Sequence, residues 1–325
     1  MYRYLYGPVP SRRLGISLGI DLIPMKTCNY NCVYCECGRG PVLTIERKEY
    51  FPPYDVLKEI LNYLKENPMP DYLTFSGSGE PTLHSKIGFI IKEIKKKFPR
   101  AKIAVITNGS LLYLKDVRMD LLEADVVLPS FDAALEEEFI KIDRPHPFIT
   151  LDKVKNGLLS FSEEFHSHGK DKQIWLEVFI IEGINSDDKN VAALRDFCLK
   201  MKPDRIQLNT LDRPGAENWV KPASKEVLER IKKQINLPNV EIISRYKYRE
   251  EIKSYRQDFE NMILETLKRR PSTLEDISEV LGINVEECRK YLEVLVFDKK
   301  VECSIQEQEN LRGIFYSIKK NSRDF

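Results

Sequence analysis

Short apolar runs rich in β-branched residues alternate with longer stretches of helical period from residue 17 to about residue 236. This rhythm is typical of repeated βα units that build a parallel sheet. Six units are expected, and a further edge strand is expected at 240–243. The predicted strands lie at 17–22, 72–75, 103–107, 126–130, 174–181 and 205–210.

Helices are expected between these strands, at 56–64, 87–98, 112–122, 151–161, 188–200 and 223–236. Right-handed crossovers of this number favour an α/β fold in the form of a partial (β/α)6 open barrel of parallel strands. In such a barrel the loops that follow the C-terminal ends of the strands form the face that carries the active site. Functional side chains should therefore follow directly after the strands.

The rhythm changes near residue 256. Three helices are expected at 258–269, 273–280 and 284–297, followed by two short strands around 300–305 and 313–318. This order, with a turn at Gly282 and a loop at 306–312, is typical of a winged helix. At 325 residues, the chain is predicted to hold a partial-barrel domain at 1–250 and a winged-helix-like domain at 256–325.

The composition excludes several classes of protein. No run of about 18 apolar residues exists, so neither a transmembrane helix nor a membrane partner is expected, and residues 1–8 lack the apolar core of a signal peptide. Four of the seven cysteines fall within residues 28–37, unlike a secreted disulfide framework. We therefore expect a cytoplasmic protein with reduced thiols and a metal site.

Cys28, Cys32 and Cys35 form a C-x3-C-x2-C pattern in the loop after the first predicted strand. Three thiolates at this spacing can hold one face of a cubane iron–sulfur cluster. Because four cysteines are the usual complement, one iron would lack a protein ligand. An open metal position of this kind can bind a substrate or cofactor.

Zinc is the alternative occupant of closely spaced cysteines. Zinc sites normally combine two separated pairs of ligands, and no second pair exists here. Cys37 could nevertheless complete a four-thiolate zinc site, act as a transient fourth ligand of a cluster, or be a spare residue. Cys198 is expected in the core, and Cys288 and Cys303 have no partner motif.

Polar turns follow three further predicted strands. They are the glycine-rich turn Ser76–Pro81, the turn Thr107–Gly109 and the segment Ser130–Asp132. Each alone is a common turn or helix cap. Their order and their placement after successive strands give them weight together.

With Tyr34 directly before the third cysteine, these motifs resemble the radical S-adenosylmethionine (SAM) superfamily over roughly the first 245 residues. The resemblance implies a [4Fe–4S] cluster on the three cysteines and SAM bound at the open iron. It also implies reductive cleavage of SAM to a 5′-deoxyadenosyl radical that abstracts hydrogen from a substrate. A low-potential ferredoxin or flavodoxin is the electron donor expected from this chemistry.

The resemblance also implies which residues bind SAM. Gly77, Ser78, Gly79 and Glu80 match the superfamily's Gly-Gly-Glu-Pro stretch, which holds the amino group, although Ser78 here separates the two glycines. Other matching positions meet the methionyl carboxylate and the ribose hydroxyls, and the segment 181–185 is near the expected adenine contact. The implied cofactor-binding residues are Tyr34, Gly77, Ser78, Gly79, Glu80, Asn108, Ser130 and Asp132.

Other polar residues of the expected barrel mouth have two interpretations each. Glu177 alternates with Trp175 and Phe179, so it is either a barrel-interior group or a bystander, and Asn209 could face substrate. His84 and His146 are interpreted as hydrogen-bonded loop histidines. Five arginines could accept an anionic substrate or be solvated surface charges: Arg12, Arg13, Arg39, Arg144 and Arg213.

Three hypotheses for function remain open. The run Gly7–Gly15, joined to the cysteine loop, resembles a subgroup near the wyosine-type tRNA-base synthases, which suggests modification of a base in tRNA or another RNA. An activase or peptide-modifying enzyme that recruits a protein substrate is the second hypothesis. The third is an iron–sulfur redox-sensing regulator, in which the turns at 76–81, 108 and 132 would have no purpose.

The charge of the predicted winged helix argues against one partner. From Arg256 onward the chain has 12 Lys or Arg and 14 Asp or Glu, and Glu286 and Glu287 begin the expected recognition helix. Modules that bind nucleic acid usually carry a basic face, and DNA readers contact bases from this part of the helix. Sequence-specific DNA binding is therefore disfavoured, and the domain is expected to pack or to recruit a protein.

Overall fold

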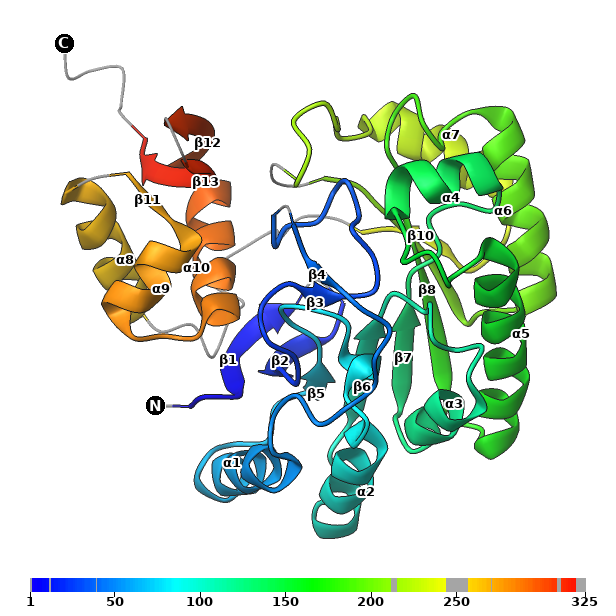
Figure 1. Ribbon diagram of the computed structural model, residues 1–325, viewed down its shortest axis with the longest axis horizontal. Coiled ribbons are helices and arrows are strands. Elements are labelled where there is room, and N and C mark those ends of the chain that lie inside the picture. Colours follow the sequence, from blue (N-terminus) through cyan, green and yellow to red (C-terminus); the bar gives the residue numbers. More distant parts are fainter. Residues whose placement is uncertain are drawn as a thin grey trace.

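A computed structural model of the chain describes residues 2–11, 13–38, 40–211, 215–243, 257–269, 271–308 and 311–319 (Figure 1). Its main sheet has the strand order β1-β2-β5-β6-β7-β8-β9-β10. β1 pairs with β2 in antiparallel fashion, and all the other neighbours are parallel. The strands are β1 (Leu5–Ser11), β2 (Gly15–Ile20), β5 (Tyr72–Phe75), β6 (Ile103–Thr107), β7 (Val126–Pro129), β8 (Gln173–Phe179), β9 (Arg205–Asn209) and β10 (Val240–Ile242).

Helices connect the parallel strands and cover their outer side (Figure 1). Their apolar faces point to the sheet; in α2, for example, Ile87, Ile90, Ile91 and Ile94 are buried. No described helix combines the length and the apolar character needed to cross a bilayer. The helices are α1 (Pro53–Glu66), the short 3-10 helix η1 (Pro81–Leu83), α2 (Ile87–Lys97), α3 (Lys115–Leu121), α4 (Glu136–Asp143), α5 (Leu151–His168), α6 (Asp188–Met201) and α7 (Lys225–Ile235).

The six parallel strands and the additional edge strand confirm the predicted α/β partial barrel. The sequence did not predict β1, whose prolines are compatible only with an edge strand. It also did not predict α4, which buries only Phe139, Ile142 and Asp143 and has Glu136, Glu137 and Glu138 in its first turn, where carboxylates favour a helix. A two-stranded pair, β3 (Thr27–Cys28) and β4 (Val42–Leu43), holds the cysteine loop.

The C-terminal unit has its own core around Ile263, Ile277 and Leu292. Its three-stranded sheet has the order β11-β13-β12, and Gly282 ends α9 with a φ of 61°. The winged-helix interpretation stays a prediction, as does the domain boundary, because 244–256 and the tip of the expected wing at 309–310 lie outside the described residues. The elements are α8 (Gln257–Arg269), β11 (Ser272–Thr273), α9 (Leu274–Leu281), α10 (Val285–Phe297), β12 (Val301–Gln308) and β13 (Leu311–Ile318).

His84, between η1 and α2, is fully buried and hydrogen-bonded. Its Nε2 donates to the carbonyl oxygen of Phe51 at 2.9 Å, and its Nδ1 accepts from the amide of Lys86 at 3.2 Å. The structure thus agrees with the interpretation of a hydrogen-bonded loop histidine. Burial lowers the pKa of His84 below its ordinary value of 6.5, so the folded protein keeps the ring neutral.

This lowered pKa predicts a loss of stability in mild acid. The unfolded chain protonates His84 more readily than the folded protein. The contribution of His84 to the free energy of unfolding is therefore fully present above pH 6.5 and declines as the pH falls below that value. His84→Gln should therefore flatten the fall of Tm between neutral pH and pH 5, as measured by calorimetry. His168→Gln, at the exposed end of α5, is the control; an equal change in both variants would contradict the prediction.

Candidate functional site

The cysteine loop is folded onto the barrel by its own backbone. Two turns form where Cys35 N donates to Cys32 O and Gly38 N donates to Cys35 O, each at 3.1 Å. Within the first turn Val33 is fully buried, and its amide donates to the carbonyl oxygen of Ile142 at the end of α4. As a result, all four cysteines of the loop line one cavity of about 110 Å³: Cys28, Cys32, Cys35 and Cys37.

The glycine-rich loop after β5 packs directly against the cysteine loop. Lys26 N donates to Ser78 O at 2.7 Å, and Glu80 N donates to Thr27 O at 3.2 Å. The contact is so close that a Cβ added at Gly79 would lie 2.0 Å from Thr27 O. Gly77 has a φ of 136°, a conformation that side chains disfavour. The glycines are therefore required for the approach of the two loops.

A larger cavity of about 270 Å³ shares Cys28, Cys32, Gly77 and Gly79 with the smaller one. The turns after β5, β6 and β7 meet there, as expected of loops at the same end of parallel strands. Lys290 of α10 also lines it. The predicted site residues that line one or both cavities are Cys28, Cys32, Cys35, Gly77, Ser78, Gly79, Glu80, Asn108 and Ser130.

Glu80 is held in one orientation at the junction of these turns. Its Oε1 accepts from Thr82 and from the hydroxyl of Thr107 at 2.6 Å, and its Oε2 accepts from the amide of Asn108 at 2.7 Å. Burial raises the pKa of Glu80 above its ordinary value, while these hydrogen bonds oppose the shift. The carboxylate is thus fixed, and Oε2 can accept a further donor.

Tyr34 and Asp132 lie behind the cavities, and neither is among the residues that line them. The ring of Tyr34 stacks on Phe179 at 3.9 Å between centroids, and its hydroxyl donates to Asp132. Asp132 also accepts from the amide of Phe179 at 2.8 Å. Burial raises the pKa of Asp132 to about 6. In this structure the two residues join the cysteine loop to β8.

Asn29 and Asp143 were not predicted from the sequence. Asp143, at the buried end of α4, accepts from the thiol of Cys32 at a sulfur–oxygen distance of 3.7 Å. Asn29 is fully buried and accepts from Asn108 Nδ2 at 2.6 Å. Its own Nδ2 is buried with no hydrogen-bond partner among the described residues. No sequence signal marks either residue, because α4 was not expected and Asn29 occupies a position that the cysteine motif leaves unspecified.

The thiols and the buried amide fit an iron–sulfur cluster. Burial raises the pKa of Cys28 to about 12 and that of Cys32 well above its ordinary value, so a bound cation is needed to hold them as thiolates. Iron–sulfur clusters accept hydrogen bonds at sulfur, and the Asn29 amide is a donor beside Cys28.

Several other predicted residues have internal partners. Glu177 accepts from Asn209 at 3.1 Å and pairs with Arg13, which makes it a barrel-interior group. Arg144 pairs with Glu217 at 2.7 Å. Arg12, Arg39 and Arg213 lie outside the described residues.

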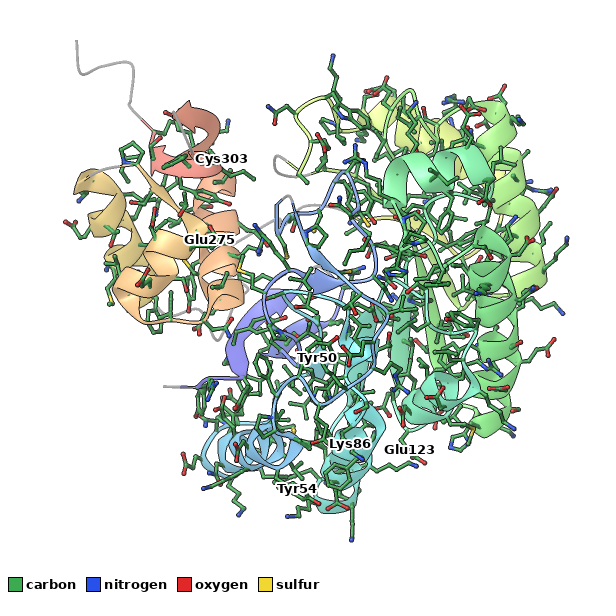
Figure 2. All side chains as sticks on the ribbon, viewed as in Figure 1. Tyr50, Tyr54, Lys86, Glu123, Glu275 and Cys303 are labelled. Carbon is green, nitrogen blue, oxygen red and sulfur yellow. The ribbon has the colours of Figure 1, made fainter. Side chains whose placement is uncertain are left out.

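Asn185 and the cysteines outside the cysteine loop lie away from the two cavities. Asn185, in the expected adenine segment, is buried and donates to the carbonyl oxygens of Asp132 and Phe179. Cys198 and Cys288 are buried in cores, and Figure 2 shows Cys303 in the C-terminal unit.

Most of the residues that line the cavities lie in a segment that matches a known protein family. The family model of the radical SAM superfamily matches residues 22–195. This segment is more than half of the chain and includes the cysteine loop and the turns after β5, β6 and β7. The chain belongs to this superfamily. Membership implies a [4Fe–4S] cluster and SAM as cofactors and supports an enzyme.

Two proteins with similar sequences differ in how much of their own length this chain covers. A UPF0026 protein of Methanocaldococcus jannaschii is 34% identical over 85% of both chains, which places this chain in the UPF0026 group. A protein of Brachyspira hyodysenteriae named GTPase Obg is 40% identical over 73% of this chain, but the chain spans only 35% of that protein.

A solved structure shares the fold. SuiB of Streptococcus suis, in a crystal structure with bound SAM, has a TM-score of 0.52 at 16% identity and covers 74% of this chain and 54% of its own. This likeness concerns the fold alone, and it agrees with the partial barrel described above.

The close approach of the two loops predicts the effect of a methyl group at residue 79. Because Thr27 O is a backbone atom, Gly79→Ala must displace one loop, and it should lower the free energy of unfolding by about 1–3 kcal/mol. The content of iron and acid-labile sulfide after anaerobic reconstitution should fall as well. Calorimetry measures the stability, and iron and sulfide analysis measures the cluster content.

Gly169→Ala is the matched control, because its added Cβ would meet nothing closer than a lysine side chain at 3.5 Å. It should keep the stability and the iron content of the wild type. The same values in Gly79→Ala would show that the loop contact does not matter.

Proposed function

We propose that this chain is a radical SAM enzyme in which Cys28, Cys32 and Cys35 hold the [4Fe–4S] cluster. The supporting observation is that the cavity of the three cysteines shares its wall with a larger cavity lined by Glu80, Asn108 and Ser130. When bound, the cluster supplies the electron that cleaves the sulfonium C–S bond of SAM and yields the 5′-deoxyadenosyl radical for hydrogen abstraction. The proposed electron donor is a cytoplasmic low-potential ferredoxin or flavodoxin.

The side chains of the larger cavity suit the polar groups of SAM. Glu80 is fixed by Thr107 and Asn108, so its Oε2 can accept from the amino group without reorganisation. The Ser130 hydroxyl can donate to carboxylate or ribose oxygens, and Asn108 lies beside it with its Nδ2 donating to Asn29 Oδ1 and 3.6 Å from Cys28 Sγ. Gly77 and Gly79 leave the backbone exposed beside Cys28.

Tyr34 and Asp132 are proposed to position the cofactor site from behind. The stacked ring of Tyr34 and the buried Val33 seal the cysteine loop against the barrel. Excluding water protects a reactive intermediate from side reactions. α10 contacts β1 beside the mouth of the larger cavity and adds to this exclusion.

The proposed substrate is a base in tRNA or another RNA. This proposal rests on the likeness of the run Gly7–Gly15 and the cysteine loop to wyosine-type tRNA-base synthases. Residues 7–11 of this run lie in β1, and Ser11 and Leu14 line the larger cavity, so the run forms part of the cavity wall.

A protein substrate is the second candidate. It is favoured by the ion pairs of Arg13 and Arg144, which leave neither guanidinium as an isolated charge for a phosphate. The C-terminal unit, proposed as a winged helix, has more acidic than basic residues and would then recruit the protein.

Cysteine variants test the proposed chemistry. Anaerobically reconstituted wild-type protein should contain iron and acid-labile sulfide and should release 5′-deoxyadenosine from SAM when reduced with dithionite. Alanine at Cys28, Cys32 or Cys35 should abolish the release, because each removes one of three ligands. Cys37→Ala is the matched control and should keep both the cluster and the release of 5′-deoxyadenosine. Wild-type protein that contains zinc and no acid-labile sulfide would contradict the proposal.

The proposed RNA substrate is tested in cells. Deletion of the gene should remove or truncate at least one modified nucleoside, as measured by mass spectrometry of digested tRNA. Restoring the wild-type gene should restore that nucleoside, whereas a Cys32→Ala gene should not. A tRNA profile unchanged by deletion would move the proposal to a protein substrate.

A further inference from the structure

Lys290 of the C-terminal unit lines the larger cavity together with Cys28, Cys32 and Glu80. It contributes the one cationic side chain among the described residues of that lining. Its side chain is 34% exposed, and Glu293 on the same helix lies 3.7 Å from its Nζ. This distance exceeds that of a hydrogen bond, so the ammonium group retains capacity for an acceptor inside the cavity.

The neighbouring residue explains why Lys290 has a fixed place. Arg289 is only 3% exposed. Its guanidinium donates to the carbonyl oxygen of Glu36 and lies 3.6 Å from the sulfur of Cys37, both in the cysteine loop. A buried guanidinium is costly without such acceptors, and α10 also contacts β1. The helix is therefore docked on the cysteine loop, with Lys290 at the cavity.

We propose that Lys290 binds an anionic oxygen, of a carboxylate or a phosphate, on the molecule that occupies the larger cavity. Two sources have this chemistry: the methionyl carboxylate of SAM and an anionic group of the substrate. The C-terminal unit is then part of the active site. The inference rests on the proposed function for the identity of the cavity as the SAM site.

Protection of lysines from acetylation tests this inference without turnover. Reconstituted holoenzyme is treated with an acetylating reagent alone, with SAM, or with millimolar inorganic phosphate, and the modified lysines are mapped by mass spectrometry. Lys268, an exposed lysine of the same unit that also pairs with a glutamate on its own helix, is the internal control. Lys290 should be protected relative to Lys268 by SAM, by phosphate, or by both.

Variants separate the two sources. If the acceptor is the SAM carboxylate, Lys290→Gln should weaken SAM binding about tenfold, the scale of a hydrogen bond to a charged group, in equilibrium dialysis. Lys290→Arg should recover part of the affinity, and Lys268→Gln should bind like the wild type. If the acceptor is a substrate group, Lys290→Gln should bind SAM normally, and phosphate alone should protect wild-type Lys290.

The inference is overturned if neither SAM nor phosphate protects Lys290 and Lys290→Gln binds SAM like the wild type. The visible absorbance of the cluster checks that each variant is folded and loaded. Failure of the proposed function is a separate result, namely wild-type protein that releases no 5′-deoxyadenosine. Phosphate protection of Lys290 would still be measurable in that protein.

Discussion

Backbone hydrogen bonds between the cysteine loop and the glycine-rich loop fix the geometry on which the whole candidate site depends. The two loops follow β2 and β5, which pair in parallel, so both emerge at the same edge of the sheet. Lys26 N to Ser78 O and Glu80 N to Thr27 O then join them directly. Because these bonds use main-chain atoms, the position of Cys28 relative to Glu80 depends on glycine at residue 79 rather than on any particular side chain.

Three buried acidic groups lie on or next to the cysteine loop and the cavities. Glu80, Asp132 and Asp143 are all nearly inaccessible to solvent, and burial raises the pKa of each. Burying carboxyl groups costs free energy unless hydrogen bonds compensate for it, and each of these groups has such bonds. Of the three, Glu80 lines a cavity, and its carboxylate complements the ammonium group of SAM, which is consistent with the proposed orientation of the cofactor.

The barrel could be predicted because β-branched runs and amphipathic helices report burial directly. The rule that side chains after parallel strands meet at one edge predicted where the site lies, and the resemblance to a known superfamily supplied the roles of Cys28, Glu80 and Asn108. The rule could not find Asp143, because α4 buries too few apolar residues to be recognised. It also could not find β1, whose Pro8 and Pro10 indicate a loop unless the strand is known to lie at a sheet edge.

The docking of the C-terminal unit shows a different limit of sequence reasoning. Periodicity identifies the apolar face that forms the core of a unit, but Arg289 and Lys290 resemble the charged surface residues of any helix. Counting charges over the whole unit gives a small acidic excess, which argues against a nucleic-acid-binding face. The net charge of the unit does not report the local arrangement. The guanidinium of Arg289 contacts the cysteine loop, and the next residue, Lys290, places a cation at the larger cavity. A unit of nearly balanced charge can therefore reach the candidate site through two adjacent basic residues.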